Sequence, residues 1–333
     1  MQYSYMLGID VSKTTIDIAL RQNKANASIV NNKFSNNLKG YKALLAWLHK
    51  EKVQIGQVLI CLENTGIYHR CLVSFLQSEQ AFVWVENPIA IKWSMGLVRG
   101  KNDAVDAQRI CLYAFRNQDK AKAYSGMDKS LQKVADLLAT RERLVQARKL
   151  LLTPIKEFKE VGLQKNSEAL ERACRKTLSA LDKEIEAIEG ELENRIEKEQ
   201  SLKDNYRFVR SVRSIGLVTA IQLLVYSHNF ERFANAKKLA TYAGLAPFEY
   251  SSGTSIRGRI KVHPMANKTL KTALHMCALS SIRHNYEMKI YYERKVGEGK
   301  NKMSVLNAIR NKILHRVYAC VRDQRMYEYK QAA

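Results

Sequence analysis

Apolar and polar residues repeat along the first part of the chain with two different periods. Short apolar runs bounded by polar turns predict strands, over residues 6–9, 15–20, 27–34, 58–62 and 82–85. Apolar residues at helical spacing predict helices, over residues 35–49, 68–77 and 103–115. The pattern therefore predicts an α/β domain in which three strands are followed by alternating helices and strands.

This order of elements is typical of an RNase H-like domain, which we place at residues 1–122. Residues 123–205 are rich in Glu, Lys, Leu and Ala and predict a helical, coiled-coil linker and oligomerisation segment. Its seam positions step by three and four residues, at Leu178, Leu181, Ile185, Ile188 and Leu192. A seam of two heptads fits an antiparallel hairpin packed on itself as well as an oligomerisation arm, so both interpretations stay open.

Residues 206–333 are expected to form a third, mainly α-helical domain. Within it, residues 212–220 resemble a helix-hairpin-helix element, in which the loop at Gly216 offers backbone N–H groups to a DNA phosphate. An ordinary helix cap is the alternative interpretation.

The charge of the chain indicates its partner. The net charge is +23, and residues 255–316 carry 14 Lys and Arg against three Glu. Such an excess predicts a surface that follows nucleic acid phosphates, with Lys268 among the candidate contacts. No apolar run is long enough to span a bilayer and the N-terminus lacks a signal-peptide pattern, so we expect no membrane partner and a cytoplasmic location. The six cysteines and seven histidines form no zinc-binding pattern.

Four carboxylates occupy comparable positions in the predicted α/β domain. Asp10 and Glu63 each close an apolar strand, and Asp103 and Asp106 are spaced to share one face of a helix. Carboxylates that converge from strand ends and a helix can hold Mg²⁺ against a phosphate. Each also has a structural alternative: an Asx turn for Asp10, a helix cap for Glu63, and an N-cap with a capping-box partner for the aspartate pair. Their joint occurrence favours the metal site.

A second candidate site follows residues 242–250. Ser251 and Ser252 precede Gly253, and cationic side chains come a few residues later, at Arg257, Arg259 and Lys261. A hydroxyl beside glycine with nearby cations suits attack on a phosphodiester. Taken alone, the motif favours an ordinary loop whose arginines contact backbone phosphates.

Taken together, these motifs resemble those of a known family of insertion-sequence transposases. Their proteins join an N-terminal DEDD RuvC-like domain to a C-terminal serine-bearing transposase domain; they are the bridge-RNA-guided recombinases, related to Piv-type DNA invertases. The matching stretches are Gly8–Lys13, Glu63–Tyr68, Val85–Pro88, Arg99–Ala107, Ala243–Pro247 and Ser252–Gly253. Two stretches depart from the family pattern: Arg213–Gly216 stands in place of Pro-Gly-Ile-Gly, and Lys261–Asn267 in place of Lys-x-Gly-Asn.

The resemblance implies roles for these residues. Asp10, Glu63, Asp103 and Asp106 would be the Mg²⁺-binding tetrad, and Ser252 the nucleophile that becomes linked to DNA, with Ser251 as the alternative serine. It also implies a structured guide RNA that pairs with donor and target DNA. The family's proteins act as a dimer of dimers, in which the tetrad of one subunit completes a site with the serine of another.

The sequence thus predicts a DNA transposase or recombinase of a mobile element. It would act on element ends and target DNA, with Mg²⁺ as its cofactor, and work as a homo-oligomer, a dimer or a tetramer. One rival is a RuvC-like metal-dependent nuclease, such as a junction resolvase, that forms no covalent intermediate. A second rival is a non-catalytic regulator that binds nucleic acid.

Overall fold

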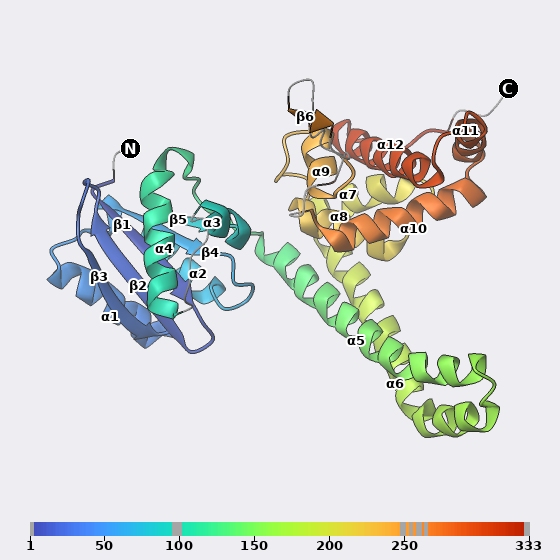
Figure 1. The fold of residues 1–333 in the computed structure, drawn as a ribbon, viewed down its shortest axis with the longest axis horizontal. Coiled ribbons are helices and arrows are strands. Elements are labelled where there is room, and N and C mark those ends of the chain that lie inside the picture. The colour runs from blue at the N-terminus through green and yellow to red at the C-terminus, as the bar shows by residue number, and fades with distance from the viewer. Residues whose placement is uncertain are drawn as a thin grey trace. The chain divides into compact units, whose positions relative to one another are not determined.

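The computed structural model describes residues 3–94, 102–246, 251–252, 256–257, 262 and 266–329. The chain divides into two compact units, Met1–Gly126 and Met127–Ala333, and each is described by itself (Figure 1). The described residues contain no helix that is long and apolar enough to cross a membrane.

Unit 1 is built on a five-stranded sheet in the order β3-β2-β1-β4-β5. Its strands are β1 (Tyr5–Val11), β2 (Thr15–Gln22), β3 (Ile29–Ser35), β4 (Val58–Glu63) and β5 (Phe82–Glu86). The first three form an antiparallel meander, whereas β4 pairs in parallel with β1 and β5 in parallel with β4. This is the strand order of the RNase H-like fold, so the predicted fold of the N-terminal domain is confirmed.

Helices lie over both faces of this sheet (Figure 1). Because side chains alternate along a strand, the apolar residues of β1 divide between two cores. Leu7, Ile9 and Val11 belong to the core that contains residues of α1 (Leu38–Lys50) and α2 (Arg70–Ser78). Met6 belongs to the other core, with residues of α3 (Pro88–Ser94) and α4 (Asp103–Arg116). Short 3₁₀ turns, η1 (Ile55–Gln57) and η2 (Gln118–Lys120), precede β4 and follow α4.

Helix α4 packs unusually close to β1, at Gly8. A Cβ atom on this residue would overlap the backbone of Ala107 and Cys111, with the Cys111 Cα only 2.7 Å away. The close approach brings the N-terminal end of α4 over the strand that carries Asp10.

Unit 2 begins with two long helices, α5 (Lys129–Glu160) and α6 (Gln164–Lys198), which run side by side as a hairpin (Figure 1). The predicted seam residues Leu178, Leu181, Ile185 and Ile188 are half-buried and Leu192 is fully buried. Arg141 and Glu189 join the two helices by an ion pair of 2.6 Å. The hairpin therefore packs on itself, and its role as an oligomerisation arm stays a prediction.

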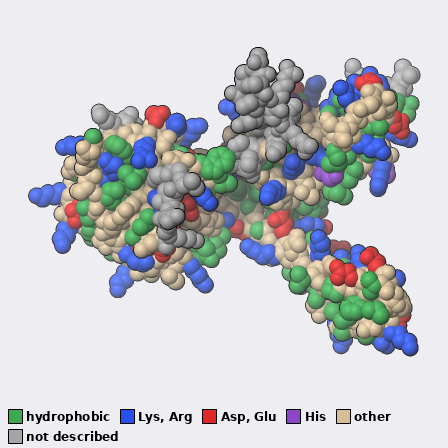
Figure 2. Space-filling view, viewed as in Figure 1, with side chains coloured by type: hydrophobic (Ala, Val, Ile, Leu, Met, Phe, Trp, Pro, Cys, Tyr) green, Lys and Arg blue, Asp and Glu red, His purple; other side chains and the backbone are tan. Residues whose placement is uncertain are grey.

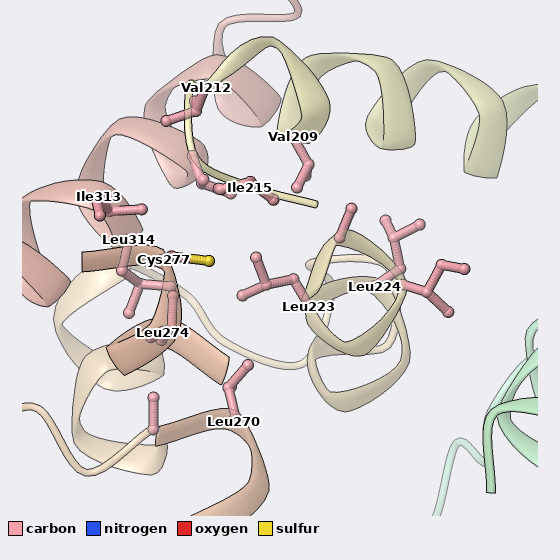
Figure 3. Packing of buried hydrophobic residues seen from close by; sticks show 14 of the residues in the cluster. Val209, Val212, Ile215, Leu223, Leu224, Leu270, Leu274, Cys277, Ile313 and Leu314 are labelled. Atoms are coloured by element: carbon pink, nitrogen blue, oxygen red, sulfur yellow. The ribbon is translucent and has the colours of Figure 1, made fainter. Parts of the chain in front are cut away.

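The rest of unit 2 is helical, as predicted. Its helices are α7 (Gln200–Ser211), α8 (Leu217–Ser227), α9 (Ala236–Tyr242), α10 (Lys268–His284), α11 (Tyr286–Gly297) and α12 (Lys302–Arg322). Leu223 of α8, Leu274 of α10 and Leu314 of α12 meet in one core (Figure 3). The same core includes Leu131 of α5 and Leu192 of α6. The base of the hairpin thus belongs to this unit, and a separate third domain beginning at residue 206 stays a prediction.

Candidate active site

Two of the four predicted carboxylates come from neighbouring parallel strands. Ile9 of β1 pairs with Leu62 of β4, so the residues that follow them, Asp10 and Glu63, lie next to each other at the carboxyl ends of these strands. By the alternation of β1 and β4, both are on the sheet face that α4 covers. Asp10 lies within β1 and Glu63 ends β4, well before α2 begins. The Asx turn and the helix cap are therefore not their roles here.

The other two carboxylates lie in the first turn of α4. Asn102 is the N-cap of this helix, and its side chain accepts a hydrogen bond of 3.1 Å from the backbone N–H of Ala104. The alternative in which Asp103 is the N-cap is therefore wrong, because the preceding asparagine already satisfies the helix end. Asp106 instead pairs with Arg109, at 2.6 Å.

The negative charges of the other three predicted carboxylates act on Asp10. Partial burial, and then the charges of Glu63, Asp103, Asp106 and Asp17, raise the pKa of Asp10 from 3.8 to about 6. Burial disfavours the ionised carboxylate, and nearby like charges disfavour it further. The structure therefore brings the other three predicted carboxylates within electrostatic reach of Asp10.

The side chains of these carboxylates do not converge on a single position where a metal ion would be bound. Among the described residues, no three His, Cys, Asp or Glu side chains are placed so as to hold one metal ion. The donor chemistry nevertheless fits Mg²⁺, since carboxylate oxygens are its preferred protein ligands. Burial, and then the neighbouring carboxylates, raise the pKa of Asp10, and a bound cation would offset both effects.

Sequence reasoning missed a fifth carboxylate at this place. Asp17 of β2 is directly opposite Asp10, and Lys33 of β3 is directly opposite Asp17. The buried Asp17 carboxylate forms an ion pair of 3.0 Å with the exposed Lys33 ammonium. Hydrogen bonding and charge attraction from Asp17 raise the pKa of Lys33. The sequence feature that could have identified Asp17 is the alternation of side chains along β2, which places Asp17 on the same face as the core residue Ala19.

The predicted residues of the C-terminal segment are only partly described. Ser251 and Ser252 form strand β6, which pairs with β7 (Ile256–Arg257), so that Ser252 lies opposite Ile256 and Ser251 opposite Arg257. Arg259 and Lys261 are outside the described residues.

Two further candidates lie at helix starts. Gly216 is the N-cap residue of α8, which follows α7 after a short turn, and its backbone conformation is extended. Lys268 is the first residue of α10 and is exposed. The backbone of Gly216 already hydrogen-bonds the Cys277 sulfur, whereas Lys268 is exposed, and the contact of either residue with DNA stays a prediction.

Lys and Arg side chains are spread over the surface of each unit (Figure 2). An RNase H-like sheet with carboxylates gathered at its strand ends, in a chain of net charge +23, is the architecture of an enzyme that acts on nucleic acid.

Comparison with known proteins specifies this class further. A family model described as "Transposase IS116/IS110/IS902 family" matches residues 206–293, and the DEDD model of IS110, described as "Transposase", matches residues 7–158. The chain belongs to the IS116/IS110/IS902 family of transposases, with a DEDD RuvC-like N-terminal domain. As a transposase, it is an enzyme that cuts and rejoins DNA.

Similar proteins span this chain to different extents. The pilin gene-inverting protein of Moraxella bovis is 27% identical over 97% of this chain and 97% of its own length. The insertion element IS110 uncharacterized 43.6 kDa protein of Streptomyces coelicolor is 33% identical over 37% of this chain and 30% of its own. RuvC of T. thermophilus in complex with a Holliday junction substrate is 12% identical over 37% of this chain and all of that chain, with a TM-score of 0.27. We assign the fold from strand order and register, independently of this weak structural likeness.

Proposed function

We propose that this transposase cuts and rejoins DNA through a covalent link to Ser252, with the tetrad Asp10, Glu63, Asp103 and Asp106 holding Mg²⁺. The observation that carries the metal part is that β1 and β4 place Asp10 beside Glu63 at their carboxyl ends, on the face covered by α4, whose first turn holds Asp103 and Asp106. Burial, and then the charges of these neighbours, raise the pKa of Asp10 to about 6. The serine part rests on the Ser252-Gly253 motif and on the resemblance that it carries; Ser252 lies within the segment matched by the transposase family model.

In this mechanism one phosphodiester is exchanged for another. The Ser252 oxygen forms a bond to phosphorus, and the bond from phosphorus to the neighbouring deoxyribose oxygen breaks. The hydroxyl proton of the serine leaves in the first step, and the departing deoxyribose oxygen gains one. The linkage energy is kept in the protein–DNA ester, so the rejoining step needs no ATP.

When bound, Mg²⁺ would supply charge stabilisation for the attacking or leaving oxygen. The chain's own contribution is to position the carboxylates: β1 and β4 fix Asp10 and Glu63, and α4 fixes the aspartate pair. Arg257, Arg259 and Lys261 would bind the phosphate on which the serine acts.

The relatives suggest two kinds of DNA rearrangement. The pilin gene-inverting protein is named for inversion of a gene, whereas the Streptomyces coelicolor protein is named from an insertion element. We propose movement of a mobile element as the reaction. A structured guide RNA would select the DNA, and a dimer or tetramer of this chain would assemble on it, as the resemblance implies.

A denaturing-gel assay for protein–DNA adducts tests the proposal. Purified protein, Mg²⁺, the RNA encoded beside the element and labelled element-junction DNA are incubated with the wild type, Ser252→Ala, Asp10→Ala and the matched control Ser251→Ala. We expect an adduct with the wild type and with Ser251→Ala, and none with the other two.

Each other result selects a different function. An adduct lost only in Ser251→Ala would move the nucleophile by one residue. Strand cleavage without any adduct, dependent on Asp10, would establish a metal nuclease of the resolvase type. DNA binding without Mg²⁺-dependent cleavage would leave a binding regulator.

A further inference from the structure

Arg310 of α12 is buried without a carboxylate partner. Its side chain belongs to a residue only 5% exposed, and its Nε atom is buried and makes no hydrogen bond. Within the described part of the chain, no Asp or Glu pairs with it. A guanidinium stays charged in proteins, and a buried charge without a counter-ion costs considerable free energy.

Among the described residues, the side chain of Arg310 is hydrogen-bonded to a neutral group. Arg310 Nη2 lies 2.7 Å from Nδ1 of His275, on α10. Burial and the charge of Arg310 lower the pKa of His275, so the imidazole is neutral and accepts the hydrogen bond through Nδ1. The imidazole orients the guanidinium, and no described carboxylate compensates its positive charge.

The same two helices hold the turn that leads to the predicted nucleophile. Asn307, one turn before Arg310 on α12, donates a hydrogen bond of 2.8 Å to the carbonyl of Leu245. Lys271, one turn before His275 on α10, lies against Gly244, where a Cβ would come 3.3 Å from its Cδ. Gly244 has a φ of +67°, which favours glycine. Leu245 is seven residues before Ser252 in the sequence.

We propose that Arg310, oriented by His275, is a phosphate-binding residue of the C-terminal unit, and that its ligand is a backbone phosphodiester of the DNA. Because Asn307 of the same helix holds Leu245, seven residues before Ser252 in the sequence, we take this DNA strand to be the one on which the serine acts, and that part rests on the proposed function. The phosphate would supply a negative charge opposite the Arg310 guanidinium, through charge-assisted, directional hydrogen bonds.

Thermal unfolding of the full-length protein in EDTA tests the site. Inorganic phosphate, and then a short single-stranded oligonucleotide, are titrated at constant ionic strength into the wild type, Arg310→Met and the matched control Arg283→Met. Arg283 is an exposed arginine in the last turn of α10. We expect phosphate to raise the Tm of the wild type and the control but not of Arg310→Met.

Two further results are expected of Arg310→Met. Without phosphate it should be at least as stable as the wild type, because an apolar chain of similar length replaces an uncompensated buried charge. Its Kd for the oligonucleotide should rise by ~10–100-fold, the loss of one charge-assisted pair. A variant that is less stable without phosphate yet keeps the full phosphate response would overturn the proposal and make Arg310 structural.

A measurement on the wild type keeps the test decisive if Arg310→Met does not fold. The ¹⁵N chemical shift of His275 Nδ1 should change on addition of phosphate, because its hydrogen-bond partner is the proposed ligand-binding group. An unchanged shift at a phosphate concentration that raises the Tm would place the anion elsewhere.

The outcome is separable from that of the adduct assay. A phosphate response that depends on Arg310, in a protein that forms no adduct, would keep the site and remove the serine mechanism. Normal adduct formation by Arg310→Met, with an unchanged phosphate response, would keep the serine mechanism and remove the phosphate site at Arg310.

Discussion

The two units of this transposase carry opposite charge imbalances. In unit 1, partial burial, and then the charges of carboxylates from β4, α4 and β2, raise the pKa of Asp10, so acidic groups gather at the sheet edge. In unit 2, the buried Arg310 is hydrogen-bonded to the neutral His275 and pairs with no Asp or Glu among the described residues. The two proposals above assign each group a partner from outside the chain, a cation for the carboxylates of unit 1 and a phosphate for Arg310 of unit 2.

The contrast extends to how each unit holds its charges. Strand pairing fixes Asp10, Glu63 and Asp17 through backbone hydrogen bonds, so their spacing follows from register. Arg310 and His275 are held by packing between two helices that are far apart in sequence. A change in register is therefore expected to affect unit 1, and a change in packing to affect unit 2.

The largest expected effect comes from Asp10→Asn. Removal of the central carboxylate should lower Mg²⁺-dependent strand cleavage by at least ~100-fold, because a metal site loses both charge and geometry. Cleavage of labelled junction DNA at saturating Mg²⁺ measures it. The matched control is Asp119→Asn, an exposed aspartate of η2 in the same unit. Equal activity of the two variants would remove Asp10 from the site.

Gly8→Ala tests whether the approach of α4 to β1 sets up the acidic group. The added Cβ would overlap the backbone of Ala107 and Cys111, so unit 1 should lose at least ~1–3 kcal/mol of stability. Gly56→Ala is the control, since no atom lies within 4 Å of a Cβ built there. Hydrogen exchange should report the loss in unit 1, with protection in unit 2 unchanged. A uniform loss across both units would mean that they unfold together.

The pKa of Asp10 predicts a pH dependence of a definite sign. Its folded value of about 6 is above the ordinary 3.8, so the folded state binds the proton more tightly than the unfolded state. Without Mg²⁺, this carboxyl therefore lowers stability as the pH rises between these two values. Asp10→Asn should gain free energy of unfolding relative to the wild type at neutral pH, and lose that advantage in acid.

Urea unfolding of both proteins in EDTA at about pH 4 and about pH 7 measures this difference. Mg²⁺ at neutral pH should stabilise the wild type and leave the variant unchanged. A stability difference independent of pH would show that the charges around Asp10 are screened.

The smallest effect is expected in the hairpin of unit 2. Arg148 and Asp182 form an exposed ion pair between α5 and α6, with side chains 40% and 54% exposed. Arg148→Gln should cost only ~0.2–1 kcal/mol, since solvent screens such pairs. Thermal unfolding at low and high salt measures it. A loss of several kcal/mol, or a change in oligomeric state by light scattering, would give the hairpin a larger part in assembly.

Much of unit 1 could be predicted from the sequence because its signals are local. The apolar runs of β1 and β4 and the helical spacing of α4 depend on neighbouring residues, so element order and the RNase H-like fold followed from them. Asp10, Glu63, Asp103 and Asp106 were found because each stands at the end of such an element. Element bounds shifted by a few residues, and Pro88 begins α3, where its fixed φ suits a first helical turn.

Other features depended on contacts between distant residues. Asp17 joins the acidic group only because antiparallel register places it opposite Asp10, and one residue of slip would turn it to the other face. Asn102, rather than Asp103, caps α4, a choice made by backbone geometry at the helix end.

The sequence by itself determined the order of elements, the identity of the acidic tetrad candidates and the excess of positive charge, because these depend on local period and composition. Only the tertiary structure decided that Arg310 is buried beside His275, 35 positions away, with no Asp or Glu partner in the part of the chain that the structure describes. The physical reason is that burial and pairing are properties of the packed core. The sequence shows which residues of a lysine- and arginine-rich helix are charged, but the packing of the helices determines which charged side chain is buried.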